Sequence, residues 1–297
     1  MRTVARYISY ILNRPIIREI TPESWFLRVR YYFYIGKKLN LENPITYNEK
    51  LQWLKLYYQQ PMLNKLADKY EVRNFVANRI GENHLIPLIG GPWDKFEDID
   101  FDMMPKQFVL KTTHDSGGVV ICRNKDNFDI YAAKEIINTH LKRKFYWIGR
   151  EWSYKKITPR IVAEKYIVDE SGYELKDYKI FCFNGVPKVI QVDFGRFTDH
   201  KRNFYSTDWK YIGFTTHIYP TDPEIKIRRP KKLPSMLSIA KKLSKGLPHV
   251  RVDLYMTNDE IYFGELTFYH GSGFEKFSPE EWDTILGGWL DLPKENG

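Results

Sequence analysis

The stretch that decides the fold is Arg251-Val252-Asp253-Leu254-Tyr255, followed by Ile261-Tyr262-Phe263-Gly264-Glu265-Leu266-Thr267. In both halves apolar residues alternate with polar or charged ones, which predicts two strands that each bury one face. The intervening residues 257–260 read Thr-Asn-Asp-Glu, which is turn chemistry. We therefore expect the two strands to form a β-hairpin.

Two acidic residues, Asp253 and Glu265, are expected to lie close together at one end of this hairpin. Carboxylates that converge on an otherwise apolar sheet repel each other and lose hydration. A divalent cation removes that cost, and oxygen ligands of this kind suit Mg²⁺. The same pattern equally fits carboxylates that face water or pair with a neighbour such as Arg251, so the hairpin by itself leaves both interpretations open.

The composition predicts a folded protein with acidic partners. The chain has 297 residues, of which 43% are hydrophobic, and a formal net charge of +9. This charge favours nucleotide phosphates, nucleic acid, anionic lipid or an acidic glycan. Cys122 and Cys182 lack metal-ligand spacing and are expected to be reduced and buried. No apolar run approaches the roughly 20 residues of a membrane span, and no signal peptide is recognisable, so we expect a cytoplasmic protein.

The chain divides into a basic helical region, 1–60, and a catalytic region, 61–297. In the first region the pair Thr46 and Glu49 has capping-box spacing, which predicts the start of a helix. Residues 1–35 are basic and rich in aromatics, which fits a peripheral contact with the anionic inner face of the cell membrane. Helices packed on the catalytic body with solvated arginines fit as well. Residues 63–80 are expected to form one helix.

A lysine and a glycine loop lie between two predicted strands. Lys111 ends the apolar strand 108–111, and Ser116, Gly117 and Gly118 precede the strand 119–122. Glycines let backbone N–H groups close on phosphate oxygens, and lysine supplies a compact cation for the same phosphates. Neither a Walker A loop nor a dinucleotide fingerprint is present. An ordinary hairpin would show the same pattern.

A third feature is Glu164-Lys165-Tyr166-Ile167, where a predicted strand ends. A strand end exposes backbone N–H and C=O groups, which can pair with the edge of an adenine ring. A plain strand end without a ligand is the alternative.

In this order the three features resemble ATP-grasp ligases, a superfamily typified by D-alanine–D-alanine ligase and biotin carboxylase. From about residue 45 onward the chain is more closely similar to the teichuronopeptide-biosynthesis (TupA-like) type, which is found with bacterial surface-polysaccharide genes. The stretches that carry this similarity are 108–111, 160–166, 175–185, 201–205 and 250–274. The resemblance implies an α+β ATP-grasp fold whose two subdomains clamp ATP. Residues 107–166 would carry the glycine loop and 167–297 the metal-binding hairpin.

The resemblance also implies roles for single residues. Those implied to bind ATP are Lys69, Lys111, Ser116, Gly117, Gly118, Glu164, Lys165, Ile167, Asp177 and Lys179. The hinge residues among them would read adenine and Asp177 would bind ribose. The implied Mg²⁺ ligands are Asp253, Glu265 and Thr267, the last of which stands where the family has asparagine. Arg251 and Gly271 are implied to surround a developing oxyanion, with Lys111 as a further catalytic group.

The activity implied by the resemblance is ATP-dependent carboxylate–amine ligation. A substrate carboxylate would attack the γ-phosphate of ATP, and an amine would then attack the resulting acyl phosphate. The substrates expected in surface-polysaccharide biosynthesis are a sugar acid or polysaccharide carboxylate and an amine or amino acid. No Ser-His-Asp or Cys-His arrangement is needed for this reaction, and the sequence shows none.

Two other functions remain open. Asp98-x-Asp100 resembles the metal motif of nucleotide-sugar enzymes, which suggests a glycosyltransferase of cell-surface polysaccharide biosynthesis. This motif normally follows an apolar strand, whereas here it lies in a polar turn segment. A non-enzymatic protein that binds membrane or nucleic acid through its basic segments, 1–60 and 226–232, is the second alternative. The cluster at 226–232 lacks interleaved aromatics for base stacking, so we expect no nucleic acid partner.

Overall fold

The predicted hairpin lies at one edge of a five-stranded antiparallel sheet. In the hairpin, β9 (His249–Thr257) pairs with β10 (Glu260–Thr267), and Asp253 lies opposite Glu265. The turn is made by Asn258 and Asp259, which have φ of 49° and 59°. The strand order is β10-β9-β5-β6-β7, with β5 (Asp177–Phe183), β6 (Val186–Phe194) and β7 (Lys201–Ser206). The hairpin prediction is confirmed.

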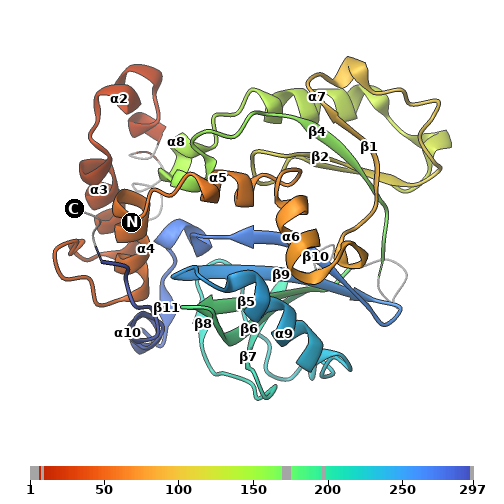
Figure 1. Cartoon of the computed structure of the whole chain (residues 1–297). Coiled ribbons are helices and arrows are strands. Elements are labelled where there is room, and N and C mark those ends of the chain that lie inside the picture. The colour runs from red at the N-terminus through yellow and green to blue at the C-terminus, as the bar shows by residue number, and fades with distance from the viewer. Residues whose placement is uncertain (1–6, 8–9, 169–174, 196–198, 295–297) are drawn as a thin grey trace.

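A second, four-stranded sheet faces the first in the computed structural model, which describes residues 7, 10–168, 175–195 and 199–294 (Figure 1). Its strand order is β1-β4-β2-β3, with β1 (Leu88–Trp93), β2 (Phe108–Thr112), β3 (Val119–Cys122) and β4 (Ile161–Lys165). Its core includes buried Ala133 and Ile137 of α7 (Ile130–Leu141), which pack with Phe108 and Leu110 of β2.

The two faces of the five-stranded sheet differ in chemistry because side chains alternate along each strand. One face of β5 and β9 is apolar and packs on α9 (Leu233–Ser244), where Cys182 Sγ lies 3.8 Å from the carbonyl oxygen of Ala240. The other face carries charged side chains. Both cysteines are free and buried, as predicted.

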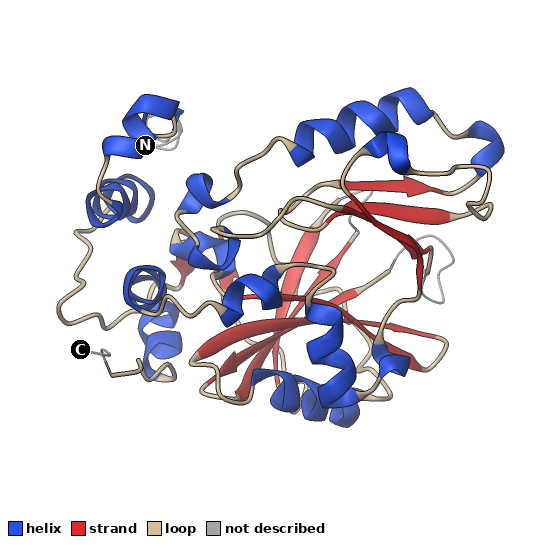
Figure 2. Ribbon diagram, turned by 45° about the horizontal axis from the view of Figure 1, so that its top comes forward, coloured by secondary structure: helices blue, strands red, loops and turns tan. Residues whose placement is uncertain are grey.

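The N-terminal helices stand at one side of the two sheets (Figure 2). They are α2 (Pro15–Ile20), α3 (Glu23–Ile35) and α4 (Tyr47–Tyr57). The predicted capping box at the start of α4 is present in both halves, because Thr46 accepts from the Glu49 N–H and Glu49 accepts from the Thr46 N–H. Residues 1–6 and 8–9 of the predicted basic region lie outside the described part of the chain.

The prediction of one helix over 63–80 is wrong, because the chain breaks into α5 (Met62–Ala67) and α6 (Val72–Ile80). The Asp68 carboxylate accepts hydrogen bonds from the N–H groups of Tyr70 at 2.7 Å and Glu71 at 3.0 Å, so it stabilises the turn that precedes the second helix. The break leaves Lys69 between the two helices.

The remaining elements are short. They are α8 (Tyr146–Gly149), α10 (Glu281–Gly288), the paired strands β8 (Thr215–Thr216) and β11 (Phe277–Ser278), and the 3-10 helices η1 (Glu82–His84), η2 (Phe96–Asp98), η3 (Lys125–Asn127), η4 (Trp152–Tyr154) and η5 (His270–Gly273). None of the helices in the described residues combines the length and the apolarity that a membrane span requires.

Candidate functional site

Polar side chains form a row across the charged face of the five-stranded sheet. The register pairs Glu265 with Asp253, Asp253 with Lys179 and Lys179 with Gln191, on four successive strands. Residues directly opposite each other in a sheet point to the same face. The row therefore brings together two predicted metal ligands and one predicted phosphate-binding lysine.

Arg251 holds the Asp253 carboxylate with two hydrogen bonds, from Nε at 2.7 Å and from the guanidinium NH2 group at 2.6 Å. The Asp253 side chain is only 1% exposed, and burial raises its pKa to about 7 although Arg251 and Lys179 oppose this. Arg251 also lies 2.9 Å from Nδ1 of His270 and so reaches the loop that contains Gly271. The sequence pattern left the Arg251–Asp253 pair as an alternative, and the structure contains it.

Glu265 is the more accessible of the two acids, with a side chain 41% exposed. Desolvation would raise its pKa, but the attraction of Arg251, Lys69 and Lys179 outweighs it and the pKa is lowered. Thr267 donates to its Oε1 atom at 3.4 Å and accepts from Arg251 at 3.0 Å. Arg251 and Thr267 both contact Oε1 of Glu265, so Oε2 is the oxygen that could act as a ligand.

The donor set of Asp253, Glu265 and Thr267 is all oxygen and suits Mg²⁺ in kind. The described residues contain no group of three or more acidic, histidine or cysteine side chains arranged around a metal position. Because Arg251 occupies both Asp253 oxygens, Glu265 fits as the principal ligand, and Asp253 would have to share its carboxylate with Arg251.

Lys179 lies among three carboxylates. Its Nζ atom pairs with Asp177, lies 2.9 Å from Asp193 and 3.8 Å from Asp253. Asp193, which also accepts from Nε of Arg202 at 2.9 Å, is a site residue that the sequence reasoning missed. The signal that could have found it is the alternation along β6, which follows the predicted Asn-Gly turn at 184–185. The ribose contact of Asp177 stays a prediction.

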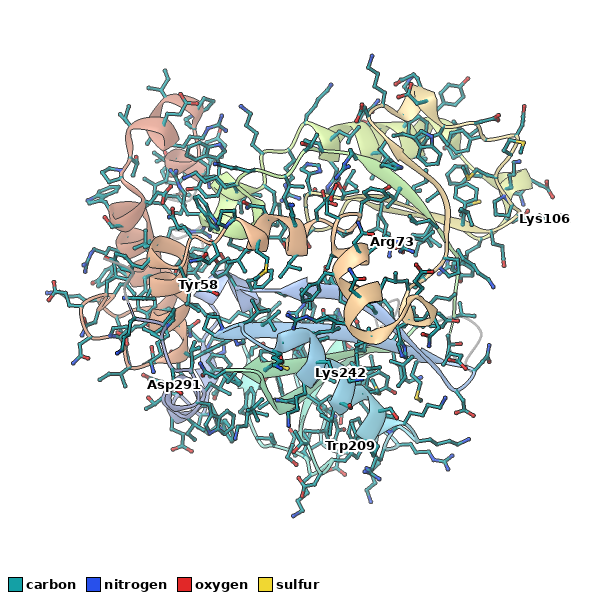
Figure 3. The ribbon with its side chains drawn as sticks, viewed as in Figure 1. Tyr58, Arg73, Lys106, Trp209, Lys242 and Asp291 are labelled. Atoms are coloured by element: carbon teal, nitrogen blue, oxygen red, sulfur yellow. The ribbon has the colours of Figure 1, made fainter. Side chains whose placement is uncertain are left out.

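The four-stranded sheet supplies the opposite wall. Lys111 of β2 donates to the Glu164 carboxylate of β4 at 2.5 Å, and Arg73 of α6 lies 3.7 Å from the other Glu164 oxygen. Arg73, labelled in Figure 3, also donates to the Ile86 carbonyl at 3.0 Å. The Glu164 side chain is therefore ion-paired with the predicted phosphate lysine.

An apolar cavity of about 220 Å³ lies beside this ion pair, where β4 leads toward the five-stranded sheet. The predicted adenine hinge, Lys165 and Ile167, forms part of its wall. The other lining residues come from both sheets and from the hinge itself: Ile86, Val109, Lys111, Val119, Ile121, Arg123, Glu164, Tyr166, Val168, Leu175 and Tyr255. The cavity thus joins the hinge to the two charged walls.

The glycine loop reaches from the four-stranded sheet to Lys69, whose Nζ atom donates to the Asp115 carbonyl. The Asp115 carboxylate accepts from Thr112 at 2.5 Å and also pairs with His140. Gly118 leaves no room for a side chain, because an added Cβ would lie 1.8 Å from Thr112 Oγ1. Buried acidic and hydroxyl groups thus anchor the base of the loop.

The tip of this loop is formed by Ser116 and Gly117, which are exposed. Gly117 has φ of 95°, a conformation that favours glycine. Behind the loop, burial lowers the pKa of Lys69, and the attraction of Glu265 and Asp115 opposes the change. Lys69 therefore interacts with both walls of the site. It bonds to the glycine loop, and it lies close enough to the β9–β10 hairpin to be attracted by Glu265.

The chain is similar to known ATP-grasp proteins. The sequence profile described as TupA-like ATPgrasp matches residues 49–291. No curated protein matches the chain. Among solved structures, D-alanine–D-alanine ligase from Bacillus anthracis is 21% identical, with 70% of this chain and 59% of that chain covered and a TM-score of 0.38.

Two further ATP-grasp structures are similar. An ADP complex of N5-carboxyaminoimidazole ribonucleotide synthetase is 17% identical and covers 74% of this chain and 50% of its own, with a TM-score of 0.45. D-alanine–D-alanine ligase from Helicobacter pylori is 14% identical and covers 82% and 69%, with a TM-score of 0.40. The chain spans 59% and 50% of the length of the first two enzymes. Its α+β fold is the ATP-grasp fold, and the profile match shows that the chain belongs to the TupA-like ATP-grasp family.

Proposed function

We propose that this protein is an ATP-dependent carboxylate–amine ligase that works through an acyl phosphate in bacterial surface-polysaccharide biosynthesis. The observation that carries the proposal is the position of Lys69. This half-buried lysine donates to the Asp115 carbonyl of the glycine loop, and the negative charge of Glu265 on the β9–β10 hairpin attracts it. A phosphate group between the two walls would meet cations from one side and acids that bind a metal from the other.

The residues of this chain would divide the work in the following way. The cavity at the hinge takes the adenine ring, and Lys69, Lys111 and Lys179 balance the charge of the phosphates. When bound, Mg²⁺ on Glu265 and Asp253 supplies electrostatic stabilisation of the phosphate oxygens. Closure of the glycine loop excludes water from the acyl phosphate.

The second half-reaction requires a donor for the oxyanion that forms when the amine attacks. Arg251 supplies a fixed positive charge for this purpose. Burial would lower its pKa, but the attraction of Asp253 and Glu265 outweighs this effect, so the pKa is raised above the ordinary value. The backbone N–H of Gly271 lies on the loop that Arg251 contacts through His270. Preorganised donors of this kind are effective because they need no rearrangement during the reaction.

For the substrates we infer a sugar acid, such as a uronic acid, and an amine or amino acid. This inference rests on the polysaccharide context that the family resemblance implies. Asp98 and Asp100, the residues of the glycosyltransferase alternative, are exposed, and the Asp100 carboxylate accepts from the Asp102 N–H at 3.0 Å within a local turn. We therefore expect alanine at Asp98 and Asp100 to leave activity intact.

We infer a cytoplasmic site of action, where ATP is available, with a peripheral contact between residues 1–35 and an anionic membrane. The helices α2 and α3 expose large apolar side chains, with Ile16 77% and Trp25 52% exposed. Arg14, Arg18 and Arg28 on the same segment supply positive charge. Co-sedimentation with anionic vesicles but not with neutral ones would support this contact.

The ligase proposal can be tested with a general trap for acyl phosphates. Purified protein is incubated with ATP, Mg²⁺, hydroxylamine and a panel of sugar acids, and hydroxamate and ADP are measured. An acid labelled with ¹⁸O in its carboxylate should transfer one label to inorganic phosphate. Release of AMP instead of ADP, or no hydroxamate with any acid, would contradict the proposal.

A further inference from the structure

The helix α4 presents three polar side chains on one face. Asn48, Gln52 and Lys55 are spaced by four and three residues, which places them above one another on a helix. They are 1%, 0% and 1% exposed, so water cannot satisfy their hydrogen bonds. Buried polar groups of this kind require protein partners.

The partners of Gln52 and Lys55 are backbone carbonyls of the loop that follows the metal hairpin. Gln52 Nε2 donates to the carbonyls of Ser272 at 3.1 Å and Gly273 at 2.7 Å. Lys55 Nζ donates to the carbonyl of Ser272 at 2.8 Å and to its hydroxyl at 3.0 Å. Two side chains of α4 thus converge on one peptide group.

Asn48 extends this contact to the far end of the same loop. Its Nδ2 atom donates to the Glu275 carbonyl at 2.8 Å and to Asp283 of α10 at 3.0 Å. The three side chains of α4 therefore hold the loop over residues 272–275.

The loop needs such support because its backbone is in an uncommon conformation. Gly271, Ser272 and Gly273 have φ of 54°, 53° and 63°, and a left-handed run of this kind is disfavoured for serine. The fit is tight on both sides, since a Cβ on Gly271 would lie 2.3 Å from Glu275 Cγ and one on Gly273 would lie 2.3 Å from Gln52 Nε2. The hydrogen bonds from α4 fix the carbonyls of Ser272 and Gly273, directly after Gly271, and so restrain the loop that carries the Gly271 N–H.

Lys55 also contacts the other side of the site. It donates to the Gly149 carbonyl at 2.8 Å, just ahead of η4 and Tyr154. Burial raises the pKa of the Tyr154 hydroxyl well above the ordinary value. The negative charge of Glu265 adds to this rise, and the positive charge of Arg251 opposes it. The Lys55 ammonium group thus bonds both to the loop that contains Gly271 and to Gly149, in the segment that leads to Tyr154.

We propose that Gln52 and Lys55 are positioning residues, which hold the Ser272–Gly273 peptide and thereby the loop that presents the Gly271 N–H for the second half-reaction. This inference rests on the proposed ligase function. Burial lowers the pKa of Lys55 to about 7, with Glu151 opposing the change and Arg30 adding to it, so a lysine here is less favourable than an apolar residue of its length. Methionine would fill the same space without donating a hydrogen bond.

The same helix offers a matched control in Lys50. Its Nζ atom donates to the carbonyls of Gly287 at 2.9 Å and Leu290 at 2.7 Å, near the C-terminus and away from the loop. Lys50→Met therefore removes two hydrogen bonds to backbone carbonyls without touching residues 270–275. Lys55→Met also removes two bonds to backbone carbonyls, together with those to the Ser272 hydroxyl and the Gln52 amide oxygen. Gln52→Met is a second test variant that leaves the charge of Lys55 in place.

Hydrogen–deuterium exchange of residues 270–275 gives a readout that needs no substrate. In Lys55→Met and Gln52→Met these amides should exchange roughly 5–30-fold faster, the factor for a loss of one or two hydrogen bonds. In Lys50→Met they should match the wild-type protein. Equal exchange in all four proteins, or equal acceleration in the control, would overturn the proposal.

The catalytic part of the proposal is read from the hydroxamate formed per ADP released. Both test variants should lower this ratio, by about 100-fold for a misplacement of about 1 Å, while binding a fluorescent ATP analogue as the wild-type protein does. Faster exchange with an unchanged ratio would mean that the contacts are structural only and would overturn the positioning role. No hydroxamate from the wild-type protein would refute the ligase proposal instead, and the exchange rates would still decide whether α4 holds the loop.

Discussion

Replacing Glu265 with glutamine should separate metal binding from stability. The Glu265 side chain is 41% exposed and its contact with Arg251 spans 3.4 Å, so this ion pair is partly solvated. A change of equal shape should therefore alter the free energy of unfolding by less than about 1 kcal/mol. If Mg²⁺ supplies about 3 kcal/mol of charge stabilisation through this carboxylate, turnover should fall roughly 100-fold or more.

Asp253→Asn provides the contrast. Its carboxylate is 1% exposed and accepts both hydrogen bonds from a buried guanidinium, so asparagine would leave Arg251 without its closest counter-charge. Breaking a buried pair in this way costs about 3–5 kcal/mol, which corresponds to a fall in Tm of roughly 6–10 °C for a chain of this size. The two substitutions should thus have different effects on the stability of the protein, although both acids were predicted as metal ligands.

The assay combines thermal unfolding with binding of a fluorescent ATP analogue over a Mg²⁺ titration, which requires no knowledge of the acid substrate. Glu265→Gln should unfold near the wild-type temperature and require more Mg²⁺ for the same occupancy. Unchanged Mg²⁺ dependence in this variant would refute its role as a ligand. An Asp253→Asn protein as stable as the wild type would refute the electrostatic argument.

Three other predictions follow from single contacts. Gly118→Ala should lower the free energy of unfolding by roughly 2–4 kcal/mol, because the new Cβ collides with Thr112 and disturbs its bond to Asp115. A midpoint of urea unfolding equal to that of the wild-type protein would contradict this. Lys111→Ala should remove ATP-dependent turnover and leave the fold intact, so ADP release at the normal rate would exclude the assigned role. Burial lowers the pKa of His249 to about 3, from an ordinary value of about 6.5. As the pH falls, the unfolded chain therefore takes up the proton before the folded protein does. The free energy of unfolding should decrease as the pH drops from about 6.5 to 3. Urea unfolding at several pH values checks this, and a His249→Gln protein with an equally steep decline would contradict it.

Local patterns predicted the strands and the hairpin well, because alternation and turn chemistry depend on neighbouring residues. The closeness of Asp253 and Glu265 was predicted from strand length, but their direct opposition depends on a shift of one residue in the register between Phe263 and Glu265, which the sequence pattern did not indicate. The helix break at Asp68 could not be read in the same way, because helical periodicity continues on both sides of it. The bonds from the Asp68 side chain to the N–H groups of Tyr70 and Glu71 stabilise a turn at the break, and this turn contains Lys69.

Contacts between distant segments were beyond the reach of the sequence. Asp193 enters the site because β6 pairs with β5 in one particular register. The turn at residues 184–185 starts this register, but a shift of one residue between Phe181 and Cys182 then changes it, and no local pattern indicated that shift. The bonds from Gln52 and Lys55 to Ser272 join residues more than 200 positions apart, so helical spacing placed them on one face without indicating what they contact. The family resemblance supplied roles for the predicted site residues, but it did not indicate these supporting contacts.

The register of β9 also limits how the length of this chain can change. An insertion of one residue inside the strand would turn Asp253 toward α9 and bring Val252 or Leu254 to the nucleotide side. A deletion would have the same effect, and no later substitution at a single position could restore the pattern. Extra residues could be accepted at the Asn258–Asp259 turn, where the chain reverses outside the row of paired acids. Natural variation in length should therefore concentrate at that turn, while the strand itself changes only by substitution.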